Sequence, residues 1–310
     1  MENPFSLEPY TTKENFCDRE QELKDIVSFL TNGSNITLIS PRRYGKTGLI
    51  FRTFEELRKQ HYTCIYADIF SAQNLDDFLK ILSEAIINSL KEDSLIKKFF
   101  IDLKNVRPLL SYDPISGSPQ ISFTFQLDGQ KTLTLKSIFD FLEKQRKHII
   151  LAIDEFQQIT RYGDETIEAT IRTYVQRCTN AHFIFSGSQR HMMNGMFTSP
   201  SRPFYQAVTI INLQPLDLDV YTDFCVNKFE KAGKHLDKAV VALLYERFEA
   251  VTSYMHRVMN VLFSRTDTGA TCDVSLVDEA VEFIIRLSSD TYESLFYQMP
   301  EKQRSLFLAI

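Results

Sequence analysis

One stretch of this chain, from Ile36 to Ile50, constrains its structure more than any other. The stretch opens with four residues that predict a short buried strand, and it closes with an apolar segment of helical spacing. Between the two lies a loop that ends in Gly45-Lys46-Thr47, where the helix is expected to begin. Backbone N–H groups of such a loop and of the helix N-terminus point at one spot and favour an anion there. The stretch therefore predicts a phosphate-binding loop.

Strand, loop, Lys-Thr and helix together form the layout of a P-loop. Gly45 lets the backbone approach a phosphate, Lys46 is expected to reach the β- and γ-phosphates, and Thr47 is expected to ligate Mg²⁺. The motif has glycine where this chain has Ser40, so a chance Gly-Lys-Thr at a helix start remains an alternative for this stretch taken alone. The loop residues expected to bind nucleotide are Ser40, Pro41, Arg42, Arg43, Tyr44, Gly45, Lys46, Thr47 and Gly48.

Composition narrows the class of protein. A chain of 310 residues is long enough for about two domains. Its net charge of −5 argues against a generally basic nucleic-acid-binding surface, although a local patch is compatible with it. The five cysteines have neither metal-ligand nor redox spacing, which indicates reduced thiols in a cytoplasmic protein. The N-terminus lacks the apolar core of a signal peptide, and no apolar run is long enough to span a bilayer, so no membrane partner is expected.

Further apolar runs alternate with helical patterns along the first two thirds of the chain. Strands are predicted at 36–39, 63–68, 148–154, 181–185 and 208–213. Such alternation indicates a parallel sheet covered by helices on both faces, that is, a three-layer αβα fold. Proline, glycine and an alternating run at 106–129 predict a hairpin inserted between core elements. After Pro215 only helical patterns remain, which places a domain boundary there.

The strand at 148–154 ends in Asp154-Glu155, a pair that a P-loop ATPase requires beside its phosphate loop. Asp154 is expected to hold Mg²⁺, and Glu155 is expected to polarise the attacking water as a general base. The plain alternative is a core strand that happens to run into two carboxylates. P-loop enzymes with this glutamate usually carry an extra strand between the two motif strands. The predicted sheet order is therefore 5-1-4-3-2, and the catalytic residues would be Lys46, Asp154 and Glu155.

In that order the fourth strand ends beside the γ-phosphate, which places Ser186 and Ser188 where a hydroxyl could sense it. A simple Ser-Gly-Ser turn is an equally good interpretation of these residues. Arg190 and Arg202 are candidates for an arginine finger, and surface arginines are the alternative for both. The sequence leaves that choice and the oligomeric state open.

Taken together, these motifs resemble the STAND branch of the AAA+ ATPases, and within it the prokaryotic group often named archaeal-type ATPases. The resemblance covers nearly the whole chain. The residues that carry it are Phe16-Cys17-Asp18-Arg19-Glu20, Ser40 to Thr47, Asp154-Glu155-Phe156-Gln157, Phe185-Ser186-Gly187-Ser188 and Pro203-Phe204-Tyr205.

The resemblance implies a P-loop ATPase core at 1–215, a helical lid at 216–288 and, at 289–310, the start of a winged-helix domain that is truncated or finds another partner. It implies that nucleotide lies between core and lid, with Phe16 near the adenine. His256 and Arg257 occupy the place from which relatives contact the nucleotide, although a helix-surface charge is as good a reading of either.

The resemblance further implies an ATP-binding and slowly hydrolysing switch, with ATP or ADP and Mg²⁺ as cofactors and an unknown protein partner in a larger assembly. The alternative is a nucleic-acid-acting AAA+ ATPase resembling a replication initiator or a helicase loader, with nucleic acid as a less favoured partner. A module that binds nucleotide only structurally is a third hypothesis, and Glu155 argues against it because a pure binder needs no base.

Overall fold

The computed structural model of the chain describes residues 3–90, 92–103, 107–112, 119–124, 129–164 and 166–308. These residues form two compact units, which are described separately. Arg19–Gln214 form the first, here called the sheet unit, and Met1–Asp18 together with Pro215–Ile310 form the second, here called the helical unit.

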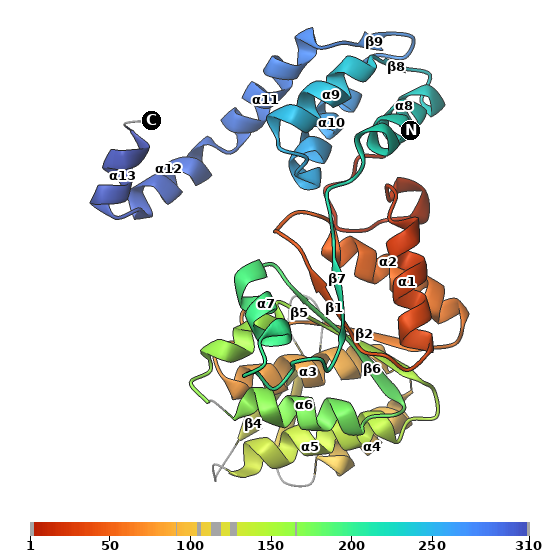
Figure 1. Cartoon of the computed structure of the whole chain (residues 1–310), viewed down its shortest axis with the longest axis vertical. Coiled ribbons are helices and arrows are strands. Elements are labelled where there is room, and N and C mark those ends of the chain that lie inside the picture. Colours follow the sequence, from red (N-terminus) through yellow and green to blue (C-terminus); the bar gives the residue numbers. More distant parts are fainter. Residues whose placement is uncertain are drawn as a thin grey trace. The chain divides into compact units, whose positions relative to one another are not determined.

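The sheet unit is built on five parallel strands (Figure 1). They are β1 (Ile36–Ile39), β2 (Thr63–Asp68), β5 (Ile149–Asp154), β6 (Ala181–Gly187) and β7 (Thr209–Asn212). Their order is β2-β5-β6-β1-β7, which confirms the predicted order 5-1-4-3-2 when the core strands are counted along the chain. A strand joins the sheet between the two motif strands, as the Asp-Glu pair had indicated.

Helices cover both faces of this sheet (Figure 1). The helices of the sheet unit are α1 (Glu20–Thr31), α2 (Lys46–Lys59), α3 (Leu75–Ser89), α4 (Asp93–Asp102), α5 (Gly129–Glu143), α6 (Ile167–Arg177), α7 (Arg190–Thr198) and the 3₁₀ turn η2 (Phe156–Arg161). All six residues of β5 are buried, as expected for a strand covered on both sides. Ile149, Leu151 and Ile153 pack into the core shared with α3, α5 and α6. The alternate residues Ile150 and Ala152 point to the other face.

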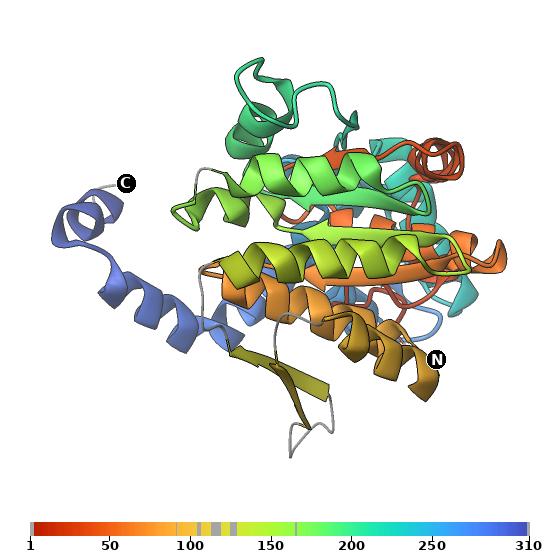
Figure 2. The same ribbon diagram turned by 90° about the horizontal axis from the view of Figure 1, so that it is seen from below.

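An antiparallel hairpin lies outside the five-stranded sheet. It consists of β3 (Arg107–Tyr112) and β4 (Pro119–Thr124), which pair only with each other among the described strands. Figure 2 shows this ribbon to one side of the sheet and its helices. Both strands fall within the insertion expected at 106–129, of which 106, 113–118 and 125–128 lie outside the described residues.

The helical unit contains, besides the 3₁₀ turn η1 (Lys13–Asn15), the elements α8 (Leu218–Lys231), β8 (His235–Leu236), α9 (Lys238–Arg247), α10 (Thr252–Arg265), β9 (Thr271–Cys272), α11 (Ser275–Leu287), α12 (Ser289–Gln298) and α13 (Glu301–Phe307). The parallel pair of β8 and β9 was not expected, because two-residue strands are too short to produce an alternating pattern. None of the helices within the described ranges is long and apolar enough to cross a membrane.

The N-terminal segment packs into the helical unit. Phe5 is fully buried there, with ring centroids 5.9 Å from Phe229 and 5.8 Å from Phe263. Asn260 donates a hydrogen bond to the carbonyl of Phe5, and Asn3 donates one to the carbonyl of Asn260. Residues 1–18 therefore cluster with the second unit, whereas the sequence-based division had placed them in a core spanning 1–215.

Four phenylalanines form an aromatic cluster directly behind the end of β5. Phe204 is fully buried, and its ring centroid lies 5.4 Å from Phe156, 5.2 Å from Phe185 and 5.3 Å from Phe197. Phe156 follows Glu155 in the chain, so the cluster anchors the backbone from which the two carboxylates project.

We expect Phe204→Ala to lower the unfolding free energy by about 3–5 kcal/mol, because it removes a ring from a packed core and leaves a cavity. The neighbouring Tyr205 is 36% exposed, and Tyr205→Ala serves as the matched control with an effect of about 0.5 kcal/mol. Urea unfolding of both variants measures the difference. Equal losses would contradict the anchoring role of this cluster.

Candidate active site

The phosphate loop, the Asp154-Glu155 pair and the Ser186-Gly187-Ser188 segment meet at one edge of the sheet, because the strands that they follow are parallel. Ile39, at the end of β1, pairs with Gly187 of β6, and Asp154, at the end of β5, pairs with Asp68 of β2. The phosphate loop leaves β1 here, and Glu155 leaves β5 here. The topology thus collects at one place side chains that are far apart in the sequence.

The loop between β1 and α2 adopts the backbone that the motif requires at its end. Gly45 precedes α2 with φ = 84°, a left-handed conformation that favours glycine. Ser40 replaces the expected glycine at the start of the loop, and it is not among the residues with positive φ. Its side chain is fully buried and donates a hydrogen bond to the carbonyl of Pro41. A serine therefore fits where the motif usually has glycine.

Lys46 is buried, and its ammonium group is held by loop oxygens. Nζ donates to the carbonyls of Ser40 and Pro41, each at 3.1 Å, and to Oγ of Ser40 at 3.2 Å. Burial lowers the pKa of Lys46, the negative charges of Asp154 and Glu155 oppose that shift, and the charge of Arg42 adds to it. The loop thus keeps a partly desolvated cation at the start of α2.

Asp154 accepts hydrogen bonds from hydroxyl groups on three different elements. Thr47 of α2 donates to Oδ2 at 3.1 Å, Tyr66 of β2 donates to Oδ2 at 2.7 Å, and Ser186 of β6 donates to Oδ1. The backbone N–H of Glu155 also donates to Oδ1. Burial and the nearby Asp154 charge raise the pKa of Tyr66, so its phenol stays protonated and remains a donor.

The residues expected to hold Mg²⁺ fit that ion. Mg²⁺ prefers octahedral coordination by oxygen at about 2.1 Å, which separates adjacent ligand oxygens by about 3 Å. Thr47 Oγ1 and Asp154 Oδ2 are 3.1 Å apart and approach each other from two elements. Both are hard oxygen donors, so this pair suits Mg²⁺ beside bound phosphates.

Glu155 stands at the exit of β5 in a strained backbone. Its φ is 56°, which is uncommon for a residue with a side chain and is concentrated at functional sites. Its Oε2 accepts hydrogen bonds from Gln157 Nε2 and, at 2.9 Å, from Ser188 Oγ. Ser188 Oγ in turn accepts one from Arg42 Nε at 3.2 Å. A chain of hydrogen bonds therefore links the phosphate loop to Glu155.

The contacts of the two loop arginines and of the two arginine-finger candidates are as follows. Arg42 also lies over the Phe70 ring, 5.9 Å from its centroid. Arg43 has φ = 69° and an exposed side chain. Arg202 forms an ion pair with the buried Glu168, whose pKa is raised by burial although Arg202 opposes the shift. Arg190 opens α7. Tyr44, half-buried, and Gly48, buried in the first turn of α2, complete the predicted loop set.

Two predicted nucleotide contacts belong to the helical unit. Phe16 packs edge-on against Tyr10, with ring centroids 5.7 Å apart. His256 lies 5.3 Å from the Phe5 ring and 6.5 Å from the Phe224 ring. Burial lowers the pKa of His256 to about 4, so the imidazole is neutral near pH 7 and offers no cationic charge to a phosphate. The expected roles of Phe16 and His256 stay predictions.

The structure adds two residues that sequence reasoning did not single out. Tyr66 was predicted only as part of a strand, and Gln157 only as part of a family-like motif. A weak signal existed for Tyr66, since its hydroxyl is the one polar group in the run from Cys64 to Ala67 of a predicted strand. The hydrogen bond from Tyr66 could not be derived without the register between β2 and β5, and that from Gln157 depends on the local turn from β5 into η2.

The strand order and the phosphate loop define a P-loop nucleoside triphosphatase fold. The chain belongs to a particular family of this class, described as an ATPase domain predominantly from Archaea, whose family model matches residues 16–266. A sequence comparison with curated proteins finds no match.

Solved structures share the fold. The Walker-type ATPase of Pyrococcus abyssi aligns over 96% of this chain and 80% of its own, with 20% identity and a TM-score of 0.63. The ORC1 protein of Aeropyrum pernix, solved in complex with DNA, aligns over 100% and 75%, with 14% identity and a TM-score of 0.61. The Cdc6p protein of Pyrobaculum aerophilum aligns over 85% and 65%, with 14% identity and a TM-score of 0.56. At identities this low, the structural likeness shows a shared fold alone.

Gly187 lies between Ser186 and Ser188 where no side chain fits. A Cβ there would come within 2.2 Å of Gln157 Oε1 and 2.6 Å of Met193 Sδ. We expect Gly187→Ala to displace Gln157, to lower the unfolding free energy by about 1–3 kcal/mol and to slow ATP turnover.

The matched control is Gly195→Ala in α7, where an added Cβ meets nothing within 4 Å. In a helix this change should be neutral or stabilising by up to about 1 kcal/mol. Thermal melting and phosphate release measure both variants. A Gly187→Ala protein that turns over ATP at the parent rate would show that the Gln157 position is irrelevant to Glu155.

Proposed function

We propose that this chain is a Mg²⁺-dependent ATPase that hydrolyses ATP slowly and uses its nucleotide state as a switch in a larger protein assembly. The observation that carries the proposal is the hydrogen-bonded chain from Arg42 through Ser188 to Glu155. It joins the loop that would bind the phosphates to the carboxylate that would act on water. Membership of an ATPase family supports the reaction class.

Each site residue has a role in this reaction. Lys46 would neutralise charge on the β- and γ-phosphates, and the loop N–H groups would hold their oxygens. Thr47 and Asp154 would hold Mg²⁺, which when bound neutralises phosphate charge. Glu155 would orient the attacking water and accept its proton. Ser186 donates a hydrogen bond to Asp154, so its hydroxyl would respond when the ligands of this carboxylate change.

Slow turnover follows from how Glu155 is held. Its Oε2 already accepts hydrogen bonds from Gln157 and Ser188. To act on water, the carboxylate must give up one of these donors or work with its other oxygen. A base engaged in this way is restrained until something rearranges its neighbours, and a nucleotide that contacts Arg42 would do so through Ser188. This restraint suits a switch better than a metabolic enzyme.

The helical unit would serve as the lid, with residues 216–288 responding to nucleotide. A lid can respond only if nucleotide binds its two orientations with different affinity. Arg257 is exposed and donates a hydrogen bond to Ser288, and it keeps its positive charge near pH 7. We therefore favour Arg257 over the neutral His256 as the lid residue that would recognise phosphate. The roles of 289–310 as the start of a winged helix and of Phe16 near adenine remain part of this proposal.

A second candidate function is action on nucleic acid. The ORC1 structure that shares this fold was solved with DNA, which favours a replication-initiator-like role. The net charge of −5 counts against it. DNA binding that weakens steeply with salt would support this alternative, because phosphate contacts release counterions.

We expect Glu155→Gln to keep ATP binding and lose hydrolysis, because an amide cannot accept the water's proton. Lys46→Ala should lose both. Nucleotide at about a hundred times its dissociation constant should stabilise the parent by ~2.7 kcal/mol, and Glu155→Gln should share that stabilisation. Melting scans with ATP and Mg²⁺, together with phosphate release, measure the two properties separately.

Parent-level hydrolysis by Glu155→Gln would remove Glu155 from the role of base. An equal melting shift in the parent and in Lys46→Ala would remove the phosphate loop from nucleotide binding.

A further inference from the structure

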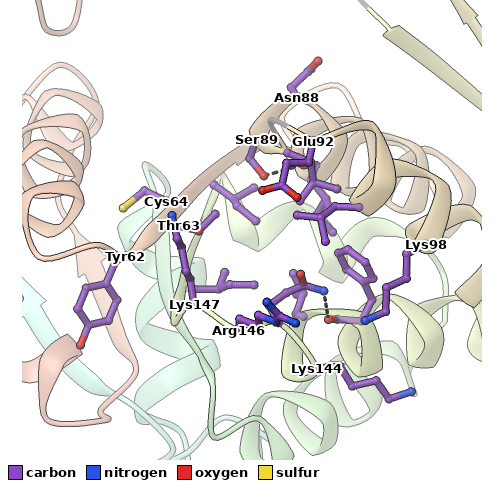
Figure 3. A pocket seen from close by; sticks show the side chains of 18 of the residues that line it. Tyr62, Thr63, Cys64, Asn88, Ser89, Glu92, Lys98, Lys144, Arg146 and Lys147 are labelled. Carbon is purple, nitrogen blue, oxygen red and sulfur yellow. Dashed lines mark hydrogen bonds between the residues drawn. The ribbon is translucent and has the colours of Figure 1, made fainter.

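A hollow lies in the sheet unit, at the edge opposite the candidate active site. It has a volume of about 1110 Å³, and its wall includes Thr63 and Ile149, the first residues of β2 and β5 (Figure 3). Both strands run from this hollow to Asp68 and Asp154. Six residues at about 3.3 Å each separate the two sites by roughly 20 Å. A ligand here would leave the phosphate loop accessible.

The rim of the hollow is strongly basic. Its lining contains five permanent cations, Arg58, Lys98, Lys144, Arg146 and Lys147, against one carboxylate, Glu92. All five cations are exposed, and none forms an ion pair with another residue of the described ranges. Figure 3 shows Lys98, Arg146 and Lys147 around the hollow, with Glu92 across it from Arg146 and Lys147. In a chain whose net charge is −5, such a concentration of unpaired positive charge is local.

The negative C-terminal ends of nearby helices offset only part of this positive charge. Three helices, α2, α3 and α5, end at the hollow, and each C-terminus carries a partial charge of about −0.5. Together with Glu92 they offset roughly two and a half positive charges. About as much positive charge is left without a counterpart, and it faces solvent around one opening.

The floor of the hollow is apolar. Ile86, Leu142 and Ile149 are buried beneath it, while Leu90 and Leu95 remain half-buried at its surface. A ligand that occupies it must therefore cover aliphatic surface as well as neutralise the rim. Phosphates alone would satisfy the cations and leave Leu90 and Leu95 wet. The lining also contains Phe141 and Tyr62, but Phe141 is buried and Tyr62 points away from the hollow (Figure 3), so the floor offers little for a nucleic-acid base to stack on.

We propose that this hollow docks an acidic protein segment that inserts an aliphatic or aromatic side chain between its carboxylates. The carboxylates would pair with Arg146, Lys147 and Lys98, and the apolar side chain would cover Leu90 and Leu95. Complementary charge at a rim around an apolar centre is the usual anatomy of a protein interface. The site is separate from the nucleotide site, so it gives the ATPase a place to hold a partner throughout its cycle.

The probe is a fluorescent peptide with glutamates on both sides of a central leucine, measured by anisotropy with the full chain. One comparison peptide carries glutamine for every glutamate, and another carries serine for the leucine. Single-stranded DNA of similar length is a third. We expect the glutamate–leucine peptide to bind more tightly than these three comparison ligands, and we expect its affinity to fall as the salt concentration rises.

The pocket variant is Arg146→Glu with Lys147→Glu, and Lys98→Glu with Lys144→Glu is a second variant of the same rim. The matched control is Lys24→Glu with Lys80→Glu, which makes the same charge change at exposed lysines outside the hollow. Each rim variant should lower the affinity for the glutamate–leucine peptide by about tenfold or more, and the control variant should lower it by about twofold at most. Unchanged melting curves show that a variant is folded.

Three results would overturn the proposal. The first is no measurable binding of the glutamate–leucine peptide to the parent. The second is an equal loss in the rim and control variants, which would indicate only long-range attraction. The third is DNA that binds more tightly than the peptide and is lost in the rim variants, which would make the hollow a nucleic-acid site.

Discussion

The carboxylate of Asp154 connects three elements of the candidate active site. It is 5% exposed, and it accepts hydroxyl hydrogen bonds from Thr47, Tyr66 and Ser186, which belong to α2, β2 and β6. A buried carboxylate destabilises the fold unless its oxygens accept hydrogen bonds, so the native arrangement depends on the correct placement of all three elements. Once they are, the phosphate loop lies next to β5, and Glu155 emerges beside it. The strand order β2-β5-β6-β1-β7 thus has a direct chemical consequence, because it places donors on both sides of one acid.

Much of the sheet unit could be predicted because its signals are local. Apolar runs such as 149–153 predict strands buried on both faces, and β2 was predicted at its observed bounds, Thr63–Asp68. Gly45-Lys46-Thr47 predicts the start of a helix after the loop, and α2 begins at Lys46 in the structure. The Asp-Glu pair predicted an additional strand between the motif strands and hence the sheet order. The strand predictions need only periodicity, whereas the sheet order came from the likeness to P-loop enzymes that carry this glutamate.

Other features depend on contacts between distant segments, and sequence patterns do not carry them. Tyr66 reaches Asp154 only because β2 and β5 pair in one particular register. Phe5 lies in an irregular segment, and its burial in the helical unit comes from packing across more than 200 residues of sequence, as its carbonyl's bond to Asn260 shows. The neutral His256 is similar: a histidine in a helix could contact phosphate or pack among aromatics, and only its neighbours decide its charge.

The central claim is that Asp154 turns this fold into a Mg²⁺-dependent nucleotide site, and the most direct measurement is ATP affinity with and without Mg²⁺. The parent should bind ATP more tightly when Mg²⁺ is present, and Asp154→Asn should lose most of that gain, because an amide is a poorer ligand for a hard cation. Asp68→Asn, at the paired position of the neighbouring strand, should keep the gain. If Asp154→Asn responds to Mg²⁺ as the parent does, the account of the site built around Asp154 is wrong.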